Sequence, residues 1–478
     1  MILDADSCYR ALTTHDARFD GRFFVGVSST RIYCRPVCTV RTPRRENCHF
    51  FPSAAAAEVE GYRPCLRCRP ELAPGNASVD ATARLAQTAV DLIEGGALEE
   101  GSLEALAARI GVTSRHLRRV FLAEFGVAPV EFAQTQRLLL AKHLLTDTAL
   151  PVTEIALASG FQSLRRFNAL FKARYRMAPS RLRRDAAPDA LPDALKFELA
   201  YRPPYAFDAM LGFLRDRAID SVERVTSHAY WRTLAIEHRG ATHAGWIEVG
   251  RAARKPALAI AVSASLAHVV PFVLSRTKQA FDLSCDPAEI ASRLGALADD
   301  PPGLRVPGAF DGFELAVRAV VGQQISVRAA RTLLGRIVRE LGTPLVAAPD
   351  GAAAMLFPRA ANLAACAPEQ IQRLGMTSSR ARTIIALATA VVDGDVDLGP
   401  GGNVEATIAR LTAIPGIGTW TAHYIAMRAL RWPDAFLAND RIVLKAMKET
   451  RPARALAQSA AWRPWRAYAV MHLWRGVS

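Results

Sequence analysis

The sequence predicts a multidomain α+β protein that is mostly helical. Three observations support this fold class. The 478 residues exceed what one hydrophobic core accommodates. A polar run broken by prolines, Asp185 to Asp193, is typical of a linker. The residue pattern also changes along the chain, from a segment rich in Arg, Cys, Pro and Phe, through helical periodicity and a mixed segment, to helical periodicity again. We expect four domains and one linker, with these bounds: 1–78, 79–186, 187–194 (the linker), 195–300 and 301–478.

The charge of the chain favours a polyanionic partner. Its 60 Lys and Arg residues against 45 Asp and Glu give a formal net charge of +15, which attracts nucleic acid. No apolar run approaches the ~20 residues that span a bilayer, and the first residues lack the pattern of a secretion signal. We therefore expect a cytoplasmic monomer without a membrane partner. Eight cysteines in such a protein indicate metal or thiol chemistry rather than disulfides.

Four of these cysteines form two close pairs in the first domain. Cys34 and Cys38 make one pair, Cys65 and Cys68 make the other, and a long excursion separates them. Two short chelating spacings with one long loop between them are the layout of a tetrathiolate zinc site. We expect a small α/β domain that binds Zn²⁺ through these four sulfurs.

The segments around the cysteines resemble the metal-binding domain of the Ada adaptive-response family. The resemblance lies in residues 26–38, 44–47 and 61–70. It implies that Cys34 is both a zinc ligand and the acceptor of a methyl group from a DNA methyl phosphotriester. Zinc keeps a bound sulfur as a nucleophilic thiolate at neutral pH. Four arginines are expected to hold the DNA backbone nearby: Arg35, Arg44, Arg45 and Arg67. A purely structural zinc knuckle is the alternative.

An internal repeat occupies the second domain. Residues 103–111 and 152–160 share one pattern, a helix closed by glycine, and each copy is followed by a basic helix. Glycine at the turn permits the close crossing of a helix-turn-helix, whose second helix enters the major groove. The tandem units resemble the AraC-type transcription-factor domain. The candidate DNA contacts on the basic helices are Arg115, Arg118, Arg165 and Arg166. Two amphipathic surface helices with solvated arginines are the alternative.

The third domain is expected to mix helices with strands. Candidate strands are 231–237, 242–249 and 257–262, where apolar and β-branched residues cluster.

A tight turn between two predicted helices marks the fourth domain. In the run from Ile414 to Gly418, Pro415 fixes one φ angle, and Gly416 and Gly418 allow backbone conformations that other residues resist. Such a hairpin directs backbone N–H groups outward at a helix N-terminus, where a phosphate can dock. By itself the hairpin indicates only non-specific binding to the DNA backbone. A turn within a helical core is the alternative.

With Asp440 downstream, the hairpin resembles the helix-hairpin-helix DNA glycosylase superfamily, whose aspartate promotes cleavage of the base–sugar bond. A carboxylate can stabilise oxocarbenium character at the sugar or orient the attacking water. Members that also cut the DNA strand carry a Schiff-base lysine after the second glycine. Thr419 and Trp420 follow Gly418 here, so no amine nucleophile is present at this place. We expect monofunctional base excision.

The second half of the chain resembles, more narrowly, the AlkA-type 3-methyladenine DNA glycosylases II. The resemblance extends from 201–214 to 462–474. It implies a pocket that stacks an alkylated base, and the matching aromatic residues are Phe213, Trp420, Tyr424 and Trp474. An N-alkylated purine is cationic, so aromatic faces attract it. Ordinary core packing is the alternative for each of these aromatic residues.

Three positions depart from the AlkA pattern. Asn439 stands where a second acidic residue is expected, and Arg441 replaces a tyrosine. The residue that would fill the gap left by a flipped base is Gln324, which is polar rather than leucine. These departures concern substrate breadth and the efficiency of base flipping.

Together these resemblances imply a bacterial, nucleoid-associated protein of the DNA alkylation response. We expect a 3-methyladenine-type glycosylase, which hydrolyses the N-glycosidic bond, fused to a methyl-accepting, sequence-specific transcriptional regulator. Its partners would be damaged double-stranded DNA, promoter sites and the transcription machinery. One alternative is a non-catalytic transcription factor that uses a decayed glycosylase domain to bind DNA. Another alternative is that only the glycosylase works and that the N-terminal half of the chain serves as its targeting module.

Overall fold

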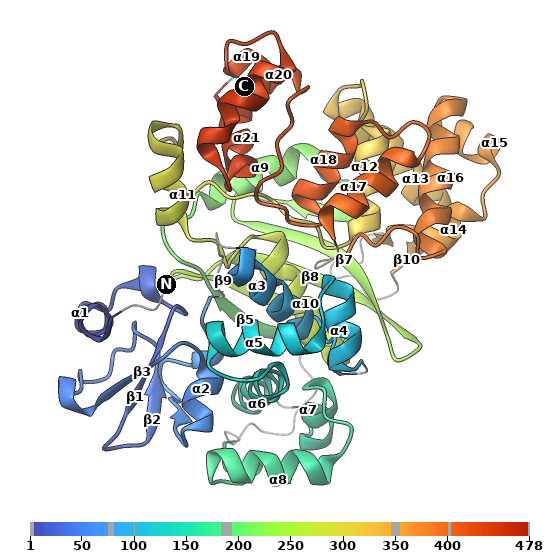
Figure 1. Cartoon of the computed structure of the whole chain (residues 1–478). Helices are drawn as coiled ribbons and strands as arrows, with labels where there is room; N and C mark the ends of the chain where they lie inside the picture. Colours follow the sequence, from blue (N-terminus) through green and yellow to red (C-terminus); the bar gives the residue numbers. More distant parts are fainter. Residues whose placement is uncertain are drawn as a thin grey trace. The chain divides into compact units, whose positions relative to one another are not determined.

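The computed structural model describes residues 4–74, 81–99, 101–148, 150–182, 194–345, 354–399 and 403–476. Apart from residue 194, the expected linker lies outside these ranges. The chain divides into two compact units, and Figure 1 shows that helices predominate. The first unit holds Met1–Pro203, Arg251–Ser275 and Leu283–Asp286, and the second holds Pro204–Gly250, Arg276–Asp282 and Pro287–Ser478. The predicted multidomain, mostly helical fold class is confirmed.

The first unit begins with a four-stranded sheet of order β3-β1-β2-β4. β1 pairs antiparallel with β2 and β3, whereas β4 runs parallel to β2. The elements are α1 (Ala5–Thr13), β1 (Phe24–Val27), β2 (Ile32–Cys34), β3 (Cys48–Phe51), α2 (Ala54–Val59) and β4 (Arg63–Pro64). Strand β2 ends at Cys34, and Cys65 follows β4 directly. Parallel pairing therefore brings the two cysteine pairs to the same end of the sheet.

Six helices follow the sheet: α3 (Ala81–Glu94), α4 (Leu103–Ile110), α5 (Ser114–Phe125), α6 (Pro129–Asp147), α7 (Val152–Ala158) and α8 (Leu164–Tyr175). The two predicted repeats are the helix pairs α4–α5 and α7–α8, which α6 separates. Helix α4 ends at Gly111, whose φ of +81° allows the chain to turn. The side chains of Thr113 and Ser163 accept backbone N–H bonds at the starts of α5 and α8. The first unit also contains the antiparallel pair β5 (Ala194–Ala200) and β9 (Ala257–Ser263).

The second unit combines an antiparallel β-meander with a helical bundle. The meander consists of β6 (Glu223–Val225), β7 (Ala229–His238) and β8 (Ala241–Arg251). The three candidate strands of the sequence fall within β7, β8 and β9. Helix α9 (Phe207–Arg217) precedes the meander and contacts β6 and β7.

Helix α12 (Gly312–Val321) lies at the centre of the bundle, because nearly all of its residues are buried. It packs against α13 (Val327–Leu341), α16 (Ser378–Val392) and α18 (Thr419–Arg428). Helix α18 in turn contacts α17 (Val404–Ala413), and α19 (Arg441–Ala446) contacts α21 (Arg466–Arg475). The remaining elements are α10 (Val270–Ala280), α11 (Pro287–Leu294), β10 (Thr343–Pro344), β11 (Met355–Leu356), α14 (Ala360–Ala364), α15 (Pro368–Gln372) and α20 (Pro452–Gln458). Among the described residues, the structure contains no helix with the length and apolar character needed to span a membrane.

Candidate active site and metal centre

Asp440 is held by four N–H donors from three helices. As the N-cap of α19, its Oδ1 accepts bonds from the backbone N–H groups of Ile442 at 2.9 Å and Val443 at 3.0 Å. The indole Nε1 of Trp420, on α18, donates to Oδ2 at 2.9 Å. The indole Nε1 of Trp474, on α21, donates to Oδ1 at 3.2 Å. Donors to both oxygens fix the orientation of the carboxylate.

Asp440 lines a cavity of about 410 Å³ together with all four predicted aromatic residues. The rings of Trp420 and Tyr424 stack with centroids 5.3 Å apart and an interplanar angle of 7°. The Trp474 ring lies 6.2 Å from that of Tyr424 and is tilted by 45°. Phe213 reaches the cavity from α9. The structure therefore brings the expected aspartate and aromatic residues into one site.

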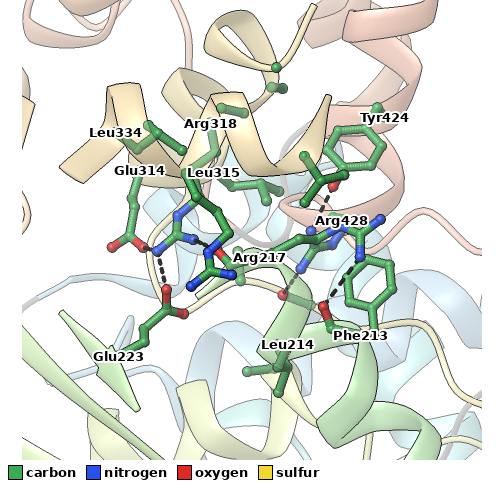
Figure 2. A pocket seen from close by; sticks show the side chains of 18 of the residues that line it. Phe213, Leu214, Arg217, Glu223, Glu314, Leu315, Arg318, Leu334, Tyr424 and Arg428 are labelled. Atoms are coloured by element: carbon green, nitrogen blue, oxygen red, sulfur yellow. Dashed lines mark hydrogen bonds and ion pairs between the residues drawn. The ribbon is translucent and has the colours of Figure 1, made fainter. Parts of the chain in front are cut away.

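Two arginines at this cavity were missed in the sequence. The guanidinium carbon of Arg217 lies 3.8 Å from the centroid of the Phe213 ring, and that of Arg428 lies 4.9 Å from it (Figure 2). Arg428 also donates to the Tyr424 hydroxyl at 2.7 Å. Burial raises the pKa of Tyr424, but the cations of Arg428 and Arg217 outweigh it and lower that pKa below its usual value. The only sequence signal was the spacing, because each arginine follows an aromatic residue by four positions on a helix.

A buried ion-pair network also lines the cavity. Arg318 Nη2 lies 2.6 Å from a carboxylate oxygen of Glu223 and 2.6 Å from one of Glu314 (Figure 2). Arg232 pairs with Glu314 at 2.7 Å, and the Tyr230 hydroxyl donates to Glu223 at 2.6 Å. Burial raises the pKa of Glu223, but Arg318 and Arg232 outweigh this effect, so the pKa is lowered. The network links α12 to β6 and β7 and gives this wall of the cavity a fixed shape.

The hairpin between α17 and α18 is anchored to α16. Gly416 has a φ of +92°, and a Cβ at this position would lie 2.1 Å from Thr383 Oγ1. The Thr383 hydroxyl donates to the Pro415 carbonyl at 2.8 Å. Only glycine fits this close approach at a left-handed backbone. Gly418 is the N-cap of α18, and among the residues that the structure describes no side chain caps the N–H groups at the start of that helix.

The four predicted metal ligands converge in the first unit. The sulfur atoms of Cys34, Cys38, Cys65 and Cys68 all lie within 4.8 Å of one another. Zn–S bonds of about 2.3 Å in a tetrahedron place sulfurs roughly 3.8 Å apart, so this cluster fits a zinc ion. The backbone N–H of Arg35 donates to Cys68 Sγ at 3.3 Å, and that of Arg67 donates to Cys65 Sγ at 3.4 Å. These N–H groups stabilise sulfur in its thiolate form.

The four arginines expected near the metal centre occupy different environments. Arg35 is buried, forms an ion pair with Asp20 and donates from Nη1 to the Cys68 carbonyl at 3.1 Å. Its guanidinium therefore supports the cysteine loop and does not face solvent. Arg44 and Arg67 are exposed, whereas Arg45 is half-buried. The Arg35–Asp20 pair joins residues far apart in sequence, so the spacing of the motif did not reveal it.

A buried polar interface joins the metal domain to the helix-turn-helix domain. Glu58, on α2, accepts hydroxyl bonds from Tyr33 at 2.9 Å and from Thr135 of α6 at 3.0 Å. Burial raises the pKa of Glu58 to about 7. A second contact is the ion pair of Lys142, on α6, with Glu71, in which Nζ lies 2.8 Å from the carboxylate. The Lys142 and Glu71 side chains are both almost fully buried.

The predicted DNA contacts on the helix-turn-helix units are all solvent-exposed. They are Arg115, Arg118, Arg165 and Arg166, two on α5 and two on α8. Gln324, the predicted gap-filling residue, is also exposed and lies in the loop between α12 and α13.

Comparison with known proteins gives matches along most of the chain. Four protein-family profiles match successive segments. They are the metal binding domain of Ada at 7–71, a helix-turn-helix domain at 106–185, the AlkA N-terminal domain at 196–311 and the HhH-GPD superfamily base excision DNA repair protein at 317–465.

Three curated relatives illustrate this composition. A probable bifunctional transcriptional activator/DNA repair enzyme AlkA of Mycobacterium tuberculosis is 37% identical over 98% of this chain and 96% of its own length. DNA-3-methyladenine glycosylase 2 of Escherichia coli is 38% identical over 58% of this chain and 96% of its own length. The bifunctional transcriptional activator/DNA repair enzyme AdaA of Bacillus subtilis is 32% identical over 37% of this chain and 82% of its own length.

Proposed function

Because this chain belongs to the family of bifunctional transcriptional activator/DNA repair enzymes AlkA, we propose that it excises alkylated bases from DNA and regulates transcription in response to DNA methylation. The four domain resemblances drawn from the sequence are confirmed by the family matches. The chain is a DNA glycosylase of the AlkA type, and the finer assignments of substrate, strand chemistry and methyl transfer are our proposal.

The observation that carries the glycosylase assignment is the position of Asp440 in a cavity lined by aromatic residues. In the proposed reaction the bond between sugar C1′ and the base nitrogen breaks, and its electron pair leaves with the base. The Asp440 carboxylate stabilises the positive charge that develops on the sugar. A water molecule then adds to C1′ and releases a proton. Thr419 and Trp420 provide no amine nucleophile, so we propose that the enzyme does not cut the strand.

The two arginines of the cavity change the expected role of the aromatic residues. Guanidinium groups already lie close to the Phe213 ring, so this ring is a poor candidate for stacking a cationic base. Trp474, which donates to Asp440 at 3.2 Å, is better placed for that contact, because Arg428 also lies 5.6 Å from the centroid of the Tyr424 ring. During the reaction, positive charge moves from an N-alkylated base to the sugar. Arg217 and Arg428 disfavour the charge on the base and Asp440 favours it on the sugar, so both effects promote bond cleavage.

The regulatory half is proposed to accept one methyl group at Cys34. The clustered sulfurs carry this assignment, because zinc would hold them as thiolates. The Cys34 sulfur attacks the methyl carbon of a DNA methyl phosphotriester and the methyl C–O bond breaks. The electron pair stays on the phosphate, which leaves a phosphodiester and a thioether. Loss of one negative charge at the metal centre strengthens DNA binding by this domain and by the exposed arginines of α5 and α8.

Release of 3-methyladenine from methylated duplex DNA by the purified full-length protein tests the first function. We expect the free base without strand cleavage beyond background. Strand nicking at the abasic product would refute the monofunctional assignment, and no base release would leave the chain with only its regulatory role.

A further inference from the structure

The loop between α12 and α13 is bonded directly to the hairpin that follows α17. Gln323, in this loop, donates from Nε2 to the Gly416 carbonyl and to Thr421 Oγ1, both at 2.9 Å. Gly416 is in the hairpin, and Thr421 is in the first turn of α18. One side-chain amide thus uses both of its N–H groups to bridge segments that lie more than ninety residues apart in sequence.

Helix α16 holds both ends of this bridge. Arg380 donates from Nη2 to the backbone carbonyl of Gln323 at 2.6 Å. On the same helix, Thr383 bonds the Pro415 carbonyl. The loop, the hairpin and α16 are therefore connected to one another by hydrogen bonds, and the side chain of Gln323 joins the loop to the hairpin.

The next residue of the loop has a backbone conformation that needs support. Gln324 has a φ of +57°, in the left-handed region that residues other than glycine rarely adopt. Such a conformation persists only where its neighbours hold it. The side chain of Gln323 is bonded to the hairpin, and its backbone carbonyl accepts a bond from Arg380. These two contacts supply that support.

We propose that Gln323 is a positioning residue that keeps the loop carrying Gln324 in register with the phosphate-binding hairpin. This inference rests on the proposed glycosylase function. When the hairpin engages the DNA backbone, the bridge fixes where Gln324 enters the duplex, so phosphate binding and extrusion of the target base occur as one event. Extrusion costs a few kcal/mol of lost pairing and stacking, least for an unpaired base. The contribution of Gln323 is therefore largest for a paired lesion.

The test uses the full-length protein and a duplex with one 7-methylguanine, placed opposite either cytosine or an abasic site. A 2-aminopurine beside the lesion reports base extrusion by its fluorescence. Gln323→Leu preserves the approximate volume and removes both N–H donors. We expect single-turnover excision to fall about tenfold opposite cytosine and less than about threefold opposite the abasic site, with unchanged duplex affinity. The 2-aminopurine signal should fall in parallel with the first rate.

Two further variants separate positioning from general destabilisation. Thr421→Val removes one acceptor with little change in volume, so it should show the same pattern more weakly. Combined with Gln323→Leu it should add almost nothing, because the two residues share one interaction. Gln458→Leu, at an exposed glutamine at the end of α20, is the matched control and should behave as wild type.

Equal losses on both duplexes, or wild-type rates in a folded Gln323→Leu protein, would overturn the positioning role. A complete lack of excision by the wild type would instead overturn the proposed function. The fluorescence signal needs no bond cleavage, so it would still decide the positioning role in that case.

Discussion

Replacing Asp440 with asparagine should distinguish the effect of the carboxylate charge from that of the position of this side chain in the candidate active site. The change Asp440→Asn keeps the volume and the helix cap, because an amide oxygen can accept the N–H groups of Ile442 and Val443. It removes the negative charge that, in the proposed reaction, stabilises the developing sugar cation. Loss of one preorganised electrostatic group typically lowers a rate by ~10²–10³. We expect that loss in single-turnover excision, with DNA affinity unchanged.

The same substitution has a defined cost in stability. If the amide oxygen faces the cap and Trp474, the amide NH₂ faces the Trp420 indole N–H, which bonds the carboxylate at 2.9 Å in the wild type. Two donors then oppose each other, and an unsatisfied buried donor costs about 1–3 kcal/mol. For a unit of this size, that corresponds to a decrease in melting temperature of roughly 2–10 °C.

A second substitution tests this account of the stability loss. In the Asp440→Asn background, Trp420→Phe removes the opposing donor, so it should destabilise the protein less than the same change does in the wild type. The lost indole volume is common to both backgrounds and cancels in the comparison. Asp4→Asn, at the exposed cap of α1 in the other unit, is the matched control and should leave excision unchanged.

Rates are measured by release of the modified base under single-turnover conditions, and stability by calorimetry. Excision by the Asn variant within about tenfold of wild type would show that the essential charge lies elsewhere. Additive effects of the two substitutions on stability would refute the opposed-donor geometry.

Three further outcomes follow from the structure. The wild-type protein should purify with one zinc ion, and Cys38→Ala and Cys65→Ala should purify without it. Structural zinc contributes on the order of 10 kcal/mol to such domains, and stoichiometric metal in both variants would contradict the four-sulfur site. Methyl phosphotriester DNA should methylate Cys34 and raise the affinity of the protein for promoter DNA at low salt, with a smaller gain at high salt. The Cys34→Ser variant should show neither effect. Modification of Cys38 or Cys65 would refute the assignment. Burial raises the pKa of Glu58 to about 7, above its ordinary value of 4.5, so the folded state binds this proton more tightly than the unfolded state does. The stability that this proton contributes is therefore lost as the pH rises from the unfolded pKa of 4.5 through the folded pKa of about 7. Glu58→Gln should therefore be more stable than wild type at pH 8 and similar to it at about pH 4, below the pKa of the unfolded state. Calorimetry at both values measures this, and a pH-independent difference would contradict it.

Local sequence signals predicted the parts of the sites that depend on short-range chemistry. The cysteine spacing indicated the metal cluster because Cys34 and Cys38, and likewise Cys65 and Cys68, chelate within single loops. The hairpin was visible because Pro415, Gly416 and Gly418 restrict or free the backbone locally.

Most contacts that sequence reasoning missed join residues from different elements of the fold. Arg35 lies beside a zinc ligand, yet its guanidinium pairs with Asp20 rather than facing solvent. Arg217 contacts Phe213 within α9, whereas Arg428 comes from α18, so its approach to Phe213 depends on how α9 packs within the second unit. The bond from Gln323 to Gly416 likewise exists only once the bundle is assembled. Spacing indicates contacts within one helix, such as that of Arg217 with Phe213, but it does not indicate contacts between segments far apart in the chain.

The buried polar contacts of Glu58 and Lys142 affect how freely this architecture can exchange its parts during evolution. Domain shuffling works best when modules meet through interchangeable apolar surfaces or through a flexible tether. Here the contacts depend on specific side chains. Lys142 pairs with the carboxylate of Glu71, and Glu58 accepts hydrogen bonds from the hydroxyl groups of Tyr33 and Thr135. A metal domain grafted from a relative without these groups would bury an unpaired charge, at a cost of about 3–5 kcal/mol. We therefore expect that exchanging either of these two domains alone destabilises the first unit unless the contacting residues of the other domain change with it.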